Sequence, residues 1–109
     1  MRTVVELKLF MRLVEGRLSD SERKALIDRL SAFPNDGDLI PGAGGARKLR
    51  WAVSGRGRSG GARVILFNHC EACPTYLLFV YLKSERTNLS QSEIARFKIA
   101  CKELSDAHK

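Results

Sequence analysis

The sequence predicts an α+β fold, with N-terminal helices packed on one face of a small, mostly antiparallel sheet, and a C-terminal helix. Three segments in the second half of the chain have the length and apolar patterning of strands and are joined by short connections, residues 47–53, 62–68 and 76–83. The segments on either side carry apolar residues at helical spacing behind helix-capping signals. A chain of 109 residues, 44% of them hydrophobic, is enough for one compact domain spanning residues 1–109.

The N-terminal part predicts one strand and two helices. Residues 3–9 alternate between apolar and polar side chains, which favours a strand, and residues 10–14 suit a short helix better. Ser19 and Glu22 have the spacing of a capping box, which predicts the start of a second helix, and Pro34 ends it. The predicted apolar face of this helix consists of Leu26, Ile27, Leu30 and Phe33.

The remaining elements follow a loop rich in proline and glycine, residues 34–46. Because the connections between the next three predicted strands are short, we expect an antiparallel meander. The last helix is expected to begin at Ser90, where Glu93 closes a second capping box. Its predicted apolar face consists of Ile94, Phe97, Cys101 and Leu104.

Positive charge is concentrated in one short segment. The formal net charge is +7, and residues 42–63 contain six basic residues and no acidic one. Such a concentration of charge predicts binding to a polyanion, most commonly a phosphate backbone. The alternative is a solvated, solubilising face, which we disfavour because such faces usually carry charges of both signs. The longest apolar run, residues 77–82, is too short to span a bilayer. We therefore expect a cytoplasmic protein with no membrane partner.

Strand geometry predicts which basic residues lie together. Because strand side chains alternate between faces, Lys48 and Arg50 face away from the core if Leu49 and Trp51 face it. The same rule directs Leu78, Val80 and Leu82 to the core and Phe79, Tyr81 and Lys83 to the open side, and it places Arg63 beside Arg50. The candidate catalytic residues are Lys48, Arg50, Arg63, Tyr81 and Lys83. The candidate RNA- or ribosome-binding residues are Arg47, Arg56, Arg58 and Arg86.

These residue types are compatible with RNA cleavage that uses no metal and no cofactor. The basic segment lacks acidic metal ligands. A two-histidine ribonuclease is hard to build, because His108 lies in the tail and His69 is about 20 Å along a strand from Arg63. RNA supplies its own nucleophile, the 2′-hydroxyl, so the protein must orient it, move two protons and stabilise charge. Arg50 and Arg63 suit the phosphate oxygens, Lys48 suits proton transfer, and Tyr81 suits base stacking or proton transfer.

The three cysteines are not expected to form a disulfide framework. An odd number of cysteines in a cytoplasmic chain argues against a disulfide framework. Cys70 and Cys73 have a Cys-x-x-Cys spacing with His69 beside them, which leaves zinc binding as the alternative to an ordinary exposed hairpin turn. We favour the exposed turn, because no second cysteine pair is present. Cys101 is expected in the core.

Three segments carry a family resemblance. Residues 42–50 (GAGGARKLR), 55–65 (GRGRSGGARVI) and 76–85 (YLLFVYLKSE) resemble the HigB branch of the RelE/ParE toxins. The resemblance covers residues 42–90, and the order of elements agrees with it over the whole chain. It implies a small RelE-like fold. It also implies a toxin of a type II toxin–antitoxin system, a ribosome-dependent and metal-independent endoribonuclease that cleaves mRNA and inhibits translation. The implied partners are the ribosome, mRNA and a cognate antitoxin, often of the helix-turn-helix type.

The resemblance also assigns residues. The family's basic catalytic positions fall on Lys48, Arg50 and Arg63, and its basic position after the last strand falls on Lys83 or Arg86. Ribosome-dependent members often carry a tyrosine near the start of the final helix, where this chain has residues 87–90 (TNLS), so Tyr81 is the substitute candidate. Relatives also often carry tyrosines where this chain has Leu66 and Phe67.

Two other classes of function remain open from the sequence. One is a gyrase poison of the ParE kind, which uses the same fold as a binder. The other is a module that binds RNA or the ribosome without cleaving RNA, since phosphate binding and phosphate cleavage use the same residue types. The combination of Lys48, Arg50 and Arg63 favours the nuclease.

Overall fold

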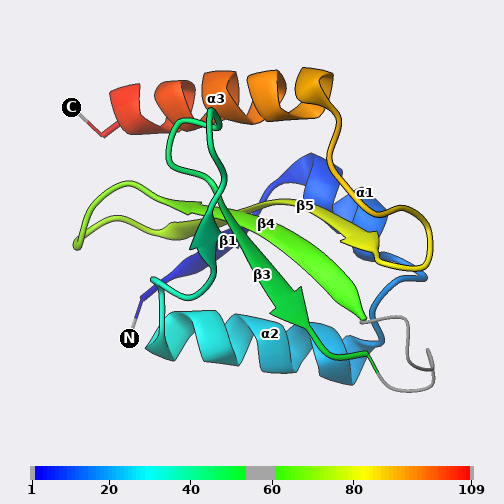
Figure 1. Ribbon diagram of the computed structural model, residues 1–109. Helices are drawn as coiled ribbons and strands as arrows, with labels where there is room; N and C mark the ends of the chain where they lie inside the picture. Colours follow the sequence, from blue (N-terminus) through cyan, green and yellow to red (C-terminus); the bar gives the residue numbers. More distant parts are fainter. Residues whose placement is uncertain (1, 54–60, 109) are drawn as a thin grey trace.

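The computed structural model describes residues 2–53 and 61–108 of the chain. Its elements are β1 (Val4–Glu6), α1 (Lys8–Val14), α2 (Asp20–Ala32), β2 (Asp38–Leu39), β3 (Arg47–Trp51), β4 (Ala62–Asn68), β5 (Thr75–Leu82) and α3 (Gln91–Asp106) (Figure 1). The α+β class is confirmed. None of the helices in the described ranges has both the length and the apolar character needed to cross a membrane.

One five-stranded sheet has the order β1-β5-β4-β3-β2. Strands β3, β4 and β5 form the predicted antiparallel meander. β2 adds two residues antiparallel to β3 at one edge, and β1 pairs in parallel with β5 at the other. The sheet is therefore mostly antiparallel, and its central strand is β4, which carries Arg63.

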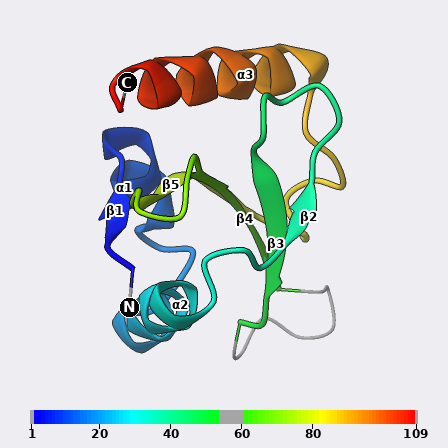
Figure 2. The same ribbon diagram turned by 90° about the vertical axis from the view of Figure 1, so that its left-hand side faces the viewer.

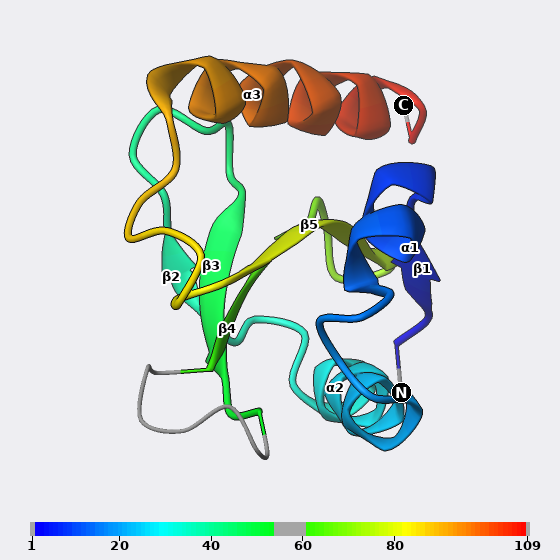
Figure 3. The ribbon, with the colours of Figure 1, turned by 90° about the vertical axis from the view of Figure 1, so that its right-hand side faces the viewer.

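Helices cover both faces of this sheet. α1 and α2 share a buried cluster with one face, in which Phe10 and Leu26 pack with Val64 and Val80. On the other face, Phe97 and Cys101 of α3 pack with Ile65 and other sheet residues. The three ribbon views agree that α2 and α3 lie on opposite sides of the sheet (Figures 1, 2 and 3). The N-terminal helices thus share one face as predicted, and the C-terminal helix closes the other.

The capping box predicted at the start of α2 is present. The Ser19 hydroxyl accepts a hydrogen bond from the Glu22 amide at 3.1 Å, and the Glu22 carboxylate accepts one from the Ser19 amide at 2.7 Å. Leu26 and Leu30 are fully buried. The placement of Phe33 on the buried face was wrong, because α2 ends at Ala32 and the Phe33 side chain is 51% exposed.

The first strand is shorter than the sequence suggested. Residues 3–9 alternate throughout, but only Val4–Glu6 pair with β5, and α1 already begins at Lys8. The Leu7 carbonyl accepts a hydrogen bond from the Met11 amide at 2.9 Å, which is the first bond of the helix. The backbone therefore turns at Leu7, inside the alternating stretch.

A β-bulge changes the orientation of one residue in β5. Ile65 pairs with Phe79 while the next residue, Leu66, pairs with Leu77, so Leu78 is the extra residue. Leu78 packs in the cluster beneath α3 and lines a cavity of about 260 Å³ together with its neighbour Phe79. The prediction that Leu78 shares a face with Val80 was therefore wrong, because the bulge interrupts the alternation of side chains.

The turn between β4 and β5 contains a disulfide bond between Cys70 and Cys73. The count of three cysteines argued against a disulfide, and that expectation was wrong here. The tight turn brings the two Cα atoms within 5.0 Å, which is inside the range that a disulfide spans. The odd number of cysteines was a misleading guide, because the third cysteine, Cys101, is buried on α3 and leaves the other two to pair with each other.

Candidate active site

A row of three residues crosses the centre of the meander. Arg50 on β3 pairs directly with Arg63 on β4, and Arg63 pairs directly with Tyr81 on β5. Directly opposed residues of antiparallel strands project from the same face of a sheet. The structure therefore brings these three predicted residues together, and it confirms the predicted proximity of Arg50 and Arg63. We call Arg50, Arg63 and Tyr81 the central row.

The neighbouring row is one step closer to α3. It consists of Lys48 on β3, Ile65 on β4 and Phe79 on β5. Phe79 contacts Phe97 of α3, with their ring centroids 5.5 Å apart and the rings nearly edge to face. Lys48 therefore lies on the same face as the central row, at the boundary between the basic residues and the apolar cluster beneath α3.

The central row is more covered than the sequence suggested. Arg50 is exposed, whereas Arg63 is 8% exposed and Tyr81 only 3% exposed. The expectation that Phe79 and Tyr81 line an open face was wrong. The reason is that α3 crosses this face against Phe79, and the side chain of Arg86 lies over both aromatic rings.

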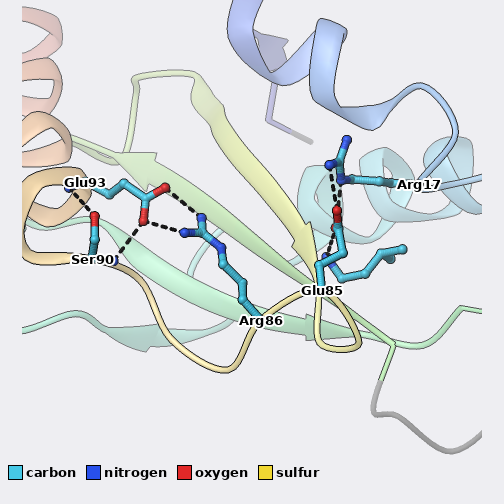
Figure 4. Close-up of polar contacts among 6 residues, drawn as sticks. Arg17, Glu85, Arg86, Ser90 and Glu93 are labelled. Atoms are coloured by element: carbon cyan, nitrogen blue, oxygen red, sulfur yellow. Dashed lines mark hydrogen bonds and ion pairs between the residues drawn. The ribbon is translucent and has the colours of Figure 1, made fainter.

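Arg86 is held in place by an ion pair. Its guanidinium carbon lies 4.8 Å from the ring centroid of Tyr81 and 5.3 Å from that of Phe79. Two of its nitrogens donate hydrogen bonds to the two carboxylate oxygens of Glu93, at 2.8 and 2.7 Å (Figure 4). These hydrogen bonds raise the pKa of Arg86 and lower that of Glu93, so both groups are charged at neutral pH.

Tyr81 carries a buried hydroxyl that finds no hydrogen-bond partner among the residues of the described ranges. Removal from water raises the pKa of this phenol, and the positive charges of Arg63 and Arg86 partly oppose the effect. Tyr81 is therefore a neutral phenol at neutral pH, able to donate a proton or a hydrogen bond.

A family model described as the RelE toxin of the RelE / RelB toxin–antitoxin system matches residues 1–109. The chain belongs to the RelE toxin family. It is therefore a toxin of a toxin–antitoxin system, a role that implies an antitoxin partner. The fold described above, with its meander flanked by helices on both faces, is consistent with this membership.

The other predicted residues of this RelE-family toxin do not all join the central row. Lys83 directly follows β5, and its amide donates a hydrogen bond to the Gly61 carbonyl at 2.9 Å, so its backbone lies beside the start of β4. Arg47 pairs with Leu66, whose side chain belongs to the cluster on the α1 and α2 face, and it donates a hydrogen bond to the Gly37 carbonyl. Arg56 and Arg58 lie outside the described residues.

Sequence reasoning missed Glu93 as a residue of the site. Its Ser-x-x-Glu spacing identified it correctly as the residue that closes the capping box of α3, with Ser90 as the N-cap. The same carboxylate also binds Arg86, seven residues earlier and across a loop. A spacing of seven across a loop carries no general signal, so only the three-dimensional structure reveals this contact.

The alternative sites weighed from the sequence lie elsewhere in the toxin. Within residues 2–53 and 61–108, no three His, Cys, Asp or Glu side chains cluster so as to hold a metal ion. The two histidines do come together, with ring centroids 6.4 Å apart, and His108 shares a 2.8 Å hydrogen bond with the Tyr76 hydroxyl. This pair sits beside the turn that follows β4, whereas Arg63 is at the start of that strand.

Proposed function

We propose that this RelE-family toxin is a ribosome-dependent endoribonuclease of the HigB kind, which cleaves mRNA without a metal ion. The observation that supports the proposal most directly is the central row, in which two arginines and a neutral phenol adjoin one another in register. Two arginines side by side suit one phosphate group, because the exposed guanidinium of Arg50 can offer parallel hydrogen bonds to phosphate oxygens and Arg63 adds a second positive charge beside it. A cognate antitoxin, for which we propose a helix-turn-helix protein, neutralises the toxin.

The proposed reaction is an attack within the RNA. The 2′-hydroxyl oxygen bonds to the adjacent phosphorus, its proton passes to a base, and the bond from phosphorus to the 5′-oxygen breaks. The departing 5′-oxygen takes up a proton, and the products are a 2′,3′-cyclic phosphate and a 5′-hydroxyl end. Charge accumulates on the phosphate oxygens in the transition state, where Arg50 and Arg63 stabilise it.

The two proton transfers of this reaction are assigned to Tyr81 and Lys48. Tyr81 is protonated at neutral pH, so it suits the donor role toward the departing 5′-oxygen. Lys48 in the next row suits the acceptor role in the fraction of molecules that carry it as the neutral amine. Because the Tyr81 hydroxyl is buried, its contact with RNA requires a movement of the groups around the hydroxyl, while Arg86 stays stacked on the face of the ring. We place that movement at ribosome binding.

A second candidate function is a module that binds RNA or the ribosome without cleaving RNA. One observation favours it: Tyr81, a residue that catalysis would use, is 3% exposed. In such a module the exposed Arg50 would bind the phosphate backbone, and the buried part of the row would serve only stability.

Primer extension on mRNA from an in vitro translation reaction separates the two. The reaction is run with the wild-type toxin, with Arg63→Ala, and with Arg12→Ala as a control. Arg12 is an exposed arginine on α1, which packs on the opposite face of the sheet, so the control loses the same charge away from the central row. An arm with EDTA uses a magnesium level that keeps ribosomes assembled.

We expect new mRNA ends with wild-type toxin and with Arg12→Ala, and their loss with Arg63→Ala. The expected loss of transition-state stabilisation for Arg63→Ala is about 3 kcal/mol, or roughly a hundredfold in rate. The ends are expected to persist in EDTA. Ribosome binding without new ends would support the binding module, and equal cleavage by all three proteins would contradict the assignment of Arg63.

A further inference from the structure

Glu93 connects two parts of the toxin through one carboxylate. Its Oε1 accepts hydrogen bonds from the Ser90 amide at 2.8 Å and from Arg86, and its Oε2 accepts a second bond from Arg86 (Figure 4). The Ser90 hydroxyl in turn accepts a hydrogen bond from the Glu93 amide at 3.1 Å. The first turn of α3 is thereby tied to the segment that follows β5.

We propose that Glu93 is a positioning residue of the active site, which acts by holding the Arg86 guanidinium over the rings of Tyr81 and Phe79. The effect on cleavage rests on the proposed function, but the effect on Arg86 does not. Nothing in the family assignment bears on Glu93, and the inference rests on the contacts alone.

Geometry explains why a carboxylate is needed here. An arginine side chain has many rotamers, and a single stacking contact does not fix the plane of its guanidinium. Two parallel hydrogen bonds to one carboxylate do fix that plane. The other carboxylate of this loop, Glu85, is already engaged, because it accepts two hydrogen bonds from Arg17 and one from the Leu82 amide. Glu93 is therefore the carboxylate available to orient Arg86.

The orientation of Arg86 matters for the charge near Tyr81. The guanidinium is stacked on the ring, and Arg63 is paired opposite the same residue on β4. The hydrogen-bond donors of Arg86 point to Glu93. Arg86 therefore borders the site and does not bind a phosphate of the RNA. Without Glu93, its donors turn to water or to RNA, and the Tyr81 ring loses the cation that covers it.

The test compares Glu93→Gln with Glu22→Gln. Glu22 closes the same type of capping box at the start of α2, on the other face of the sheet, so the control makes the same substitution in an equivalent helix cap without reaching Arg86. The first measurement is NMR on the isolated toxin. Protons of the Arg86 side chain that lie over aromatic rings have upfield-shifted resonances, and we expect these shifts to be lost in Glu93→Gln and kept in Glu22→Gln.

The second measurement is single-turnover cleavage of ribosome-bound mRNA. We expect Glu93→Gln to bind ribosomes as tightly as wild type or more tightly, and to cleave roughly 10- to 100-fold more slowly. If Glu93 acts through Arg86, adding Glu93→Gln to Arg86→Ala has no further effect on the cleavage rate. Additive effects of the two substitutions would overturn the proposal.

The two proposals fail in different ways. Wild-type toxin that does not cleave mRNA contradicts the proposed function, and the NMR comparison still decides whether Glu93 holds Arg86. Unchanged Arg86 shifts in Glu93→Gln overturn the positioning role even if cleavage is normal in wild type. Should Glu93→Gln not fold, acid titration of the wild-type toxin protonates Glu93, and the Arg86 resonances must then move with it.

Discussion

Tyr81 combines near-complete burial with a hydroxyl that has no hydrogen-bond partner in the described part of the chain. Leaving a buried hydroxyl unpaired costs about 1–3 kcal/mol relative to a paired one. Most protein interiors avoid that cost, and the exceptions are concentrated where a polar group is kept for use. The position of Tyr81 in register with Arg63 is consistent with a group kept for a ligand.

Replacing Tyr81 with Phe separates stability from activity. The substitution keeps the ring beneath Arg86 and removes only the unpaired hydroxyl. We expect the free energy of unfolding to rise by about 1 kcal/mol, because the cost of burying the hydroxyl is removed, and single-turnover cleavage to slow. Urea unfolding and the ribosome cleavage assay measure the two effects. A loss of stability would mean that the hydroxyl is hydrogen-bonded in solution, and normal cleavage would remove Tyr81 from the reaction.

The sequence predicts the members of the central row but not their environment. Strand alternation is a local property, so it correctly placed Lys48 and Arg50 on one face and paired Arg63 with Arg50. Burial depends on what packs above a strand. Arg86 covers the ring of Tyr81 and α3 packs against Phe79, and both are brought there by tertiary contacts that the pattern of the strand does not contain.

The same distinction holds for whole elements. Both capping boxes and the strand Ala62–Asn68 agree with the sequence pattern, because hydrogen bonds and side-chain periodicity within a few residues specify them. The two-residue strand β2 and the parallel pairing of β1 were not predicted, because they depend on β3 and β5 as partners. The bulge at Leu78 was missed for the same reason, since a register shift is a relation between two strands.

Two ion pairs connect neighbouring elements on the side of β5. Arg17, between α1 and α2, binds Glu85 just after β5 through two hydrogen bonds at 2.9 and 2.7 Å, and Arg86 binds Glu93 on α3 (Figure 4). In each pair the hydrogen bonds from the arginine are the main reason that the pKa of the glutamate lies below its ordinary value of 4.5. Folding is therefore linked to the ionisation of both glutamates.

The sign of this linkage predicts loss of stability in acid. The unfolded chain takes up protons on these glutamates at a higher pH than the folded chain does. The stabilisation is thus complete above pH 4.5 and is lost as the pH falls through the lowered folded-state pKa values. We expect urea unfolding between pH 3 and pH 6 to show a shallower acid loss in Glu85→Gln/Glu93→Gln than in wild type.

A control for this measurement is Asp28→Asn, which removes an exposed ion pair within α2, where the side chains are 78% and 63% exposed. Exposed pairs of this kind contribute little, so its stability curve should run close to that of wild type. Parallel curves for wild type and the double variant would contradict the linkage.

At the scale of the whole molecule, the central row and the disulfide turn lie at opposite ends of β4. Arg63 is near the start of β4, and the disulfide turn follows its end, seven residues later, or roughly 20 Å along an extended strand. Arg2 ties the N-terminal segment to this turn through hydrogen bonds to the Asn68 side chain and the Cys70 carbonyl. The central row is therefore held by the meander and α3, and the distant turn by its own contacts.

This separation predicts that the disulfide supports stability and not cleavage. Cys70 and Cys73 are three residues apart, and closing so short a loop restricts the unfolded chain only slightly, which limits the stabilisation to about 2 kcal/mol. The third cysteine offers an internal control, because burial raises the pKa of the Cys101 thiol to about 11 and keeps it unreactive. Mild reduction followed by iodoacetamide should therefore add two alkyl groups to the folded toxin, counted by mass spectrometry.

We expect this alkylated protein to cleave mRNA at the wild-type rate while unfolding at slightly lower urea concentration. Addition of a third group would show that the fold had opened, and a slower reaction with only two groups added would mean that the turn and the central row are coupled through β4.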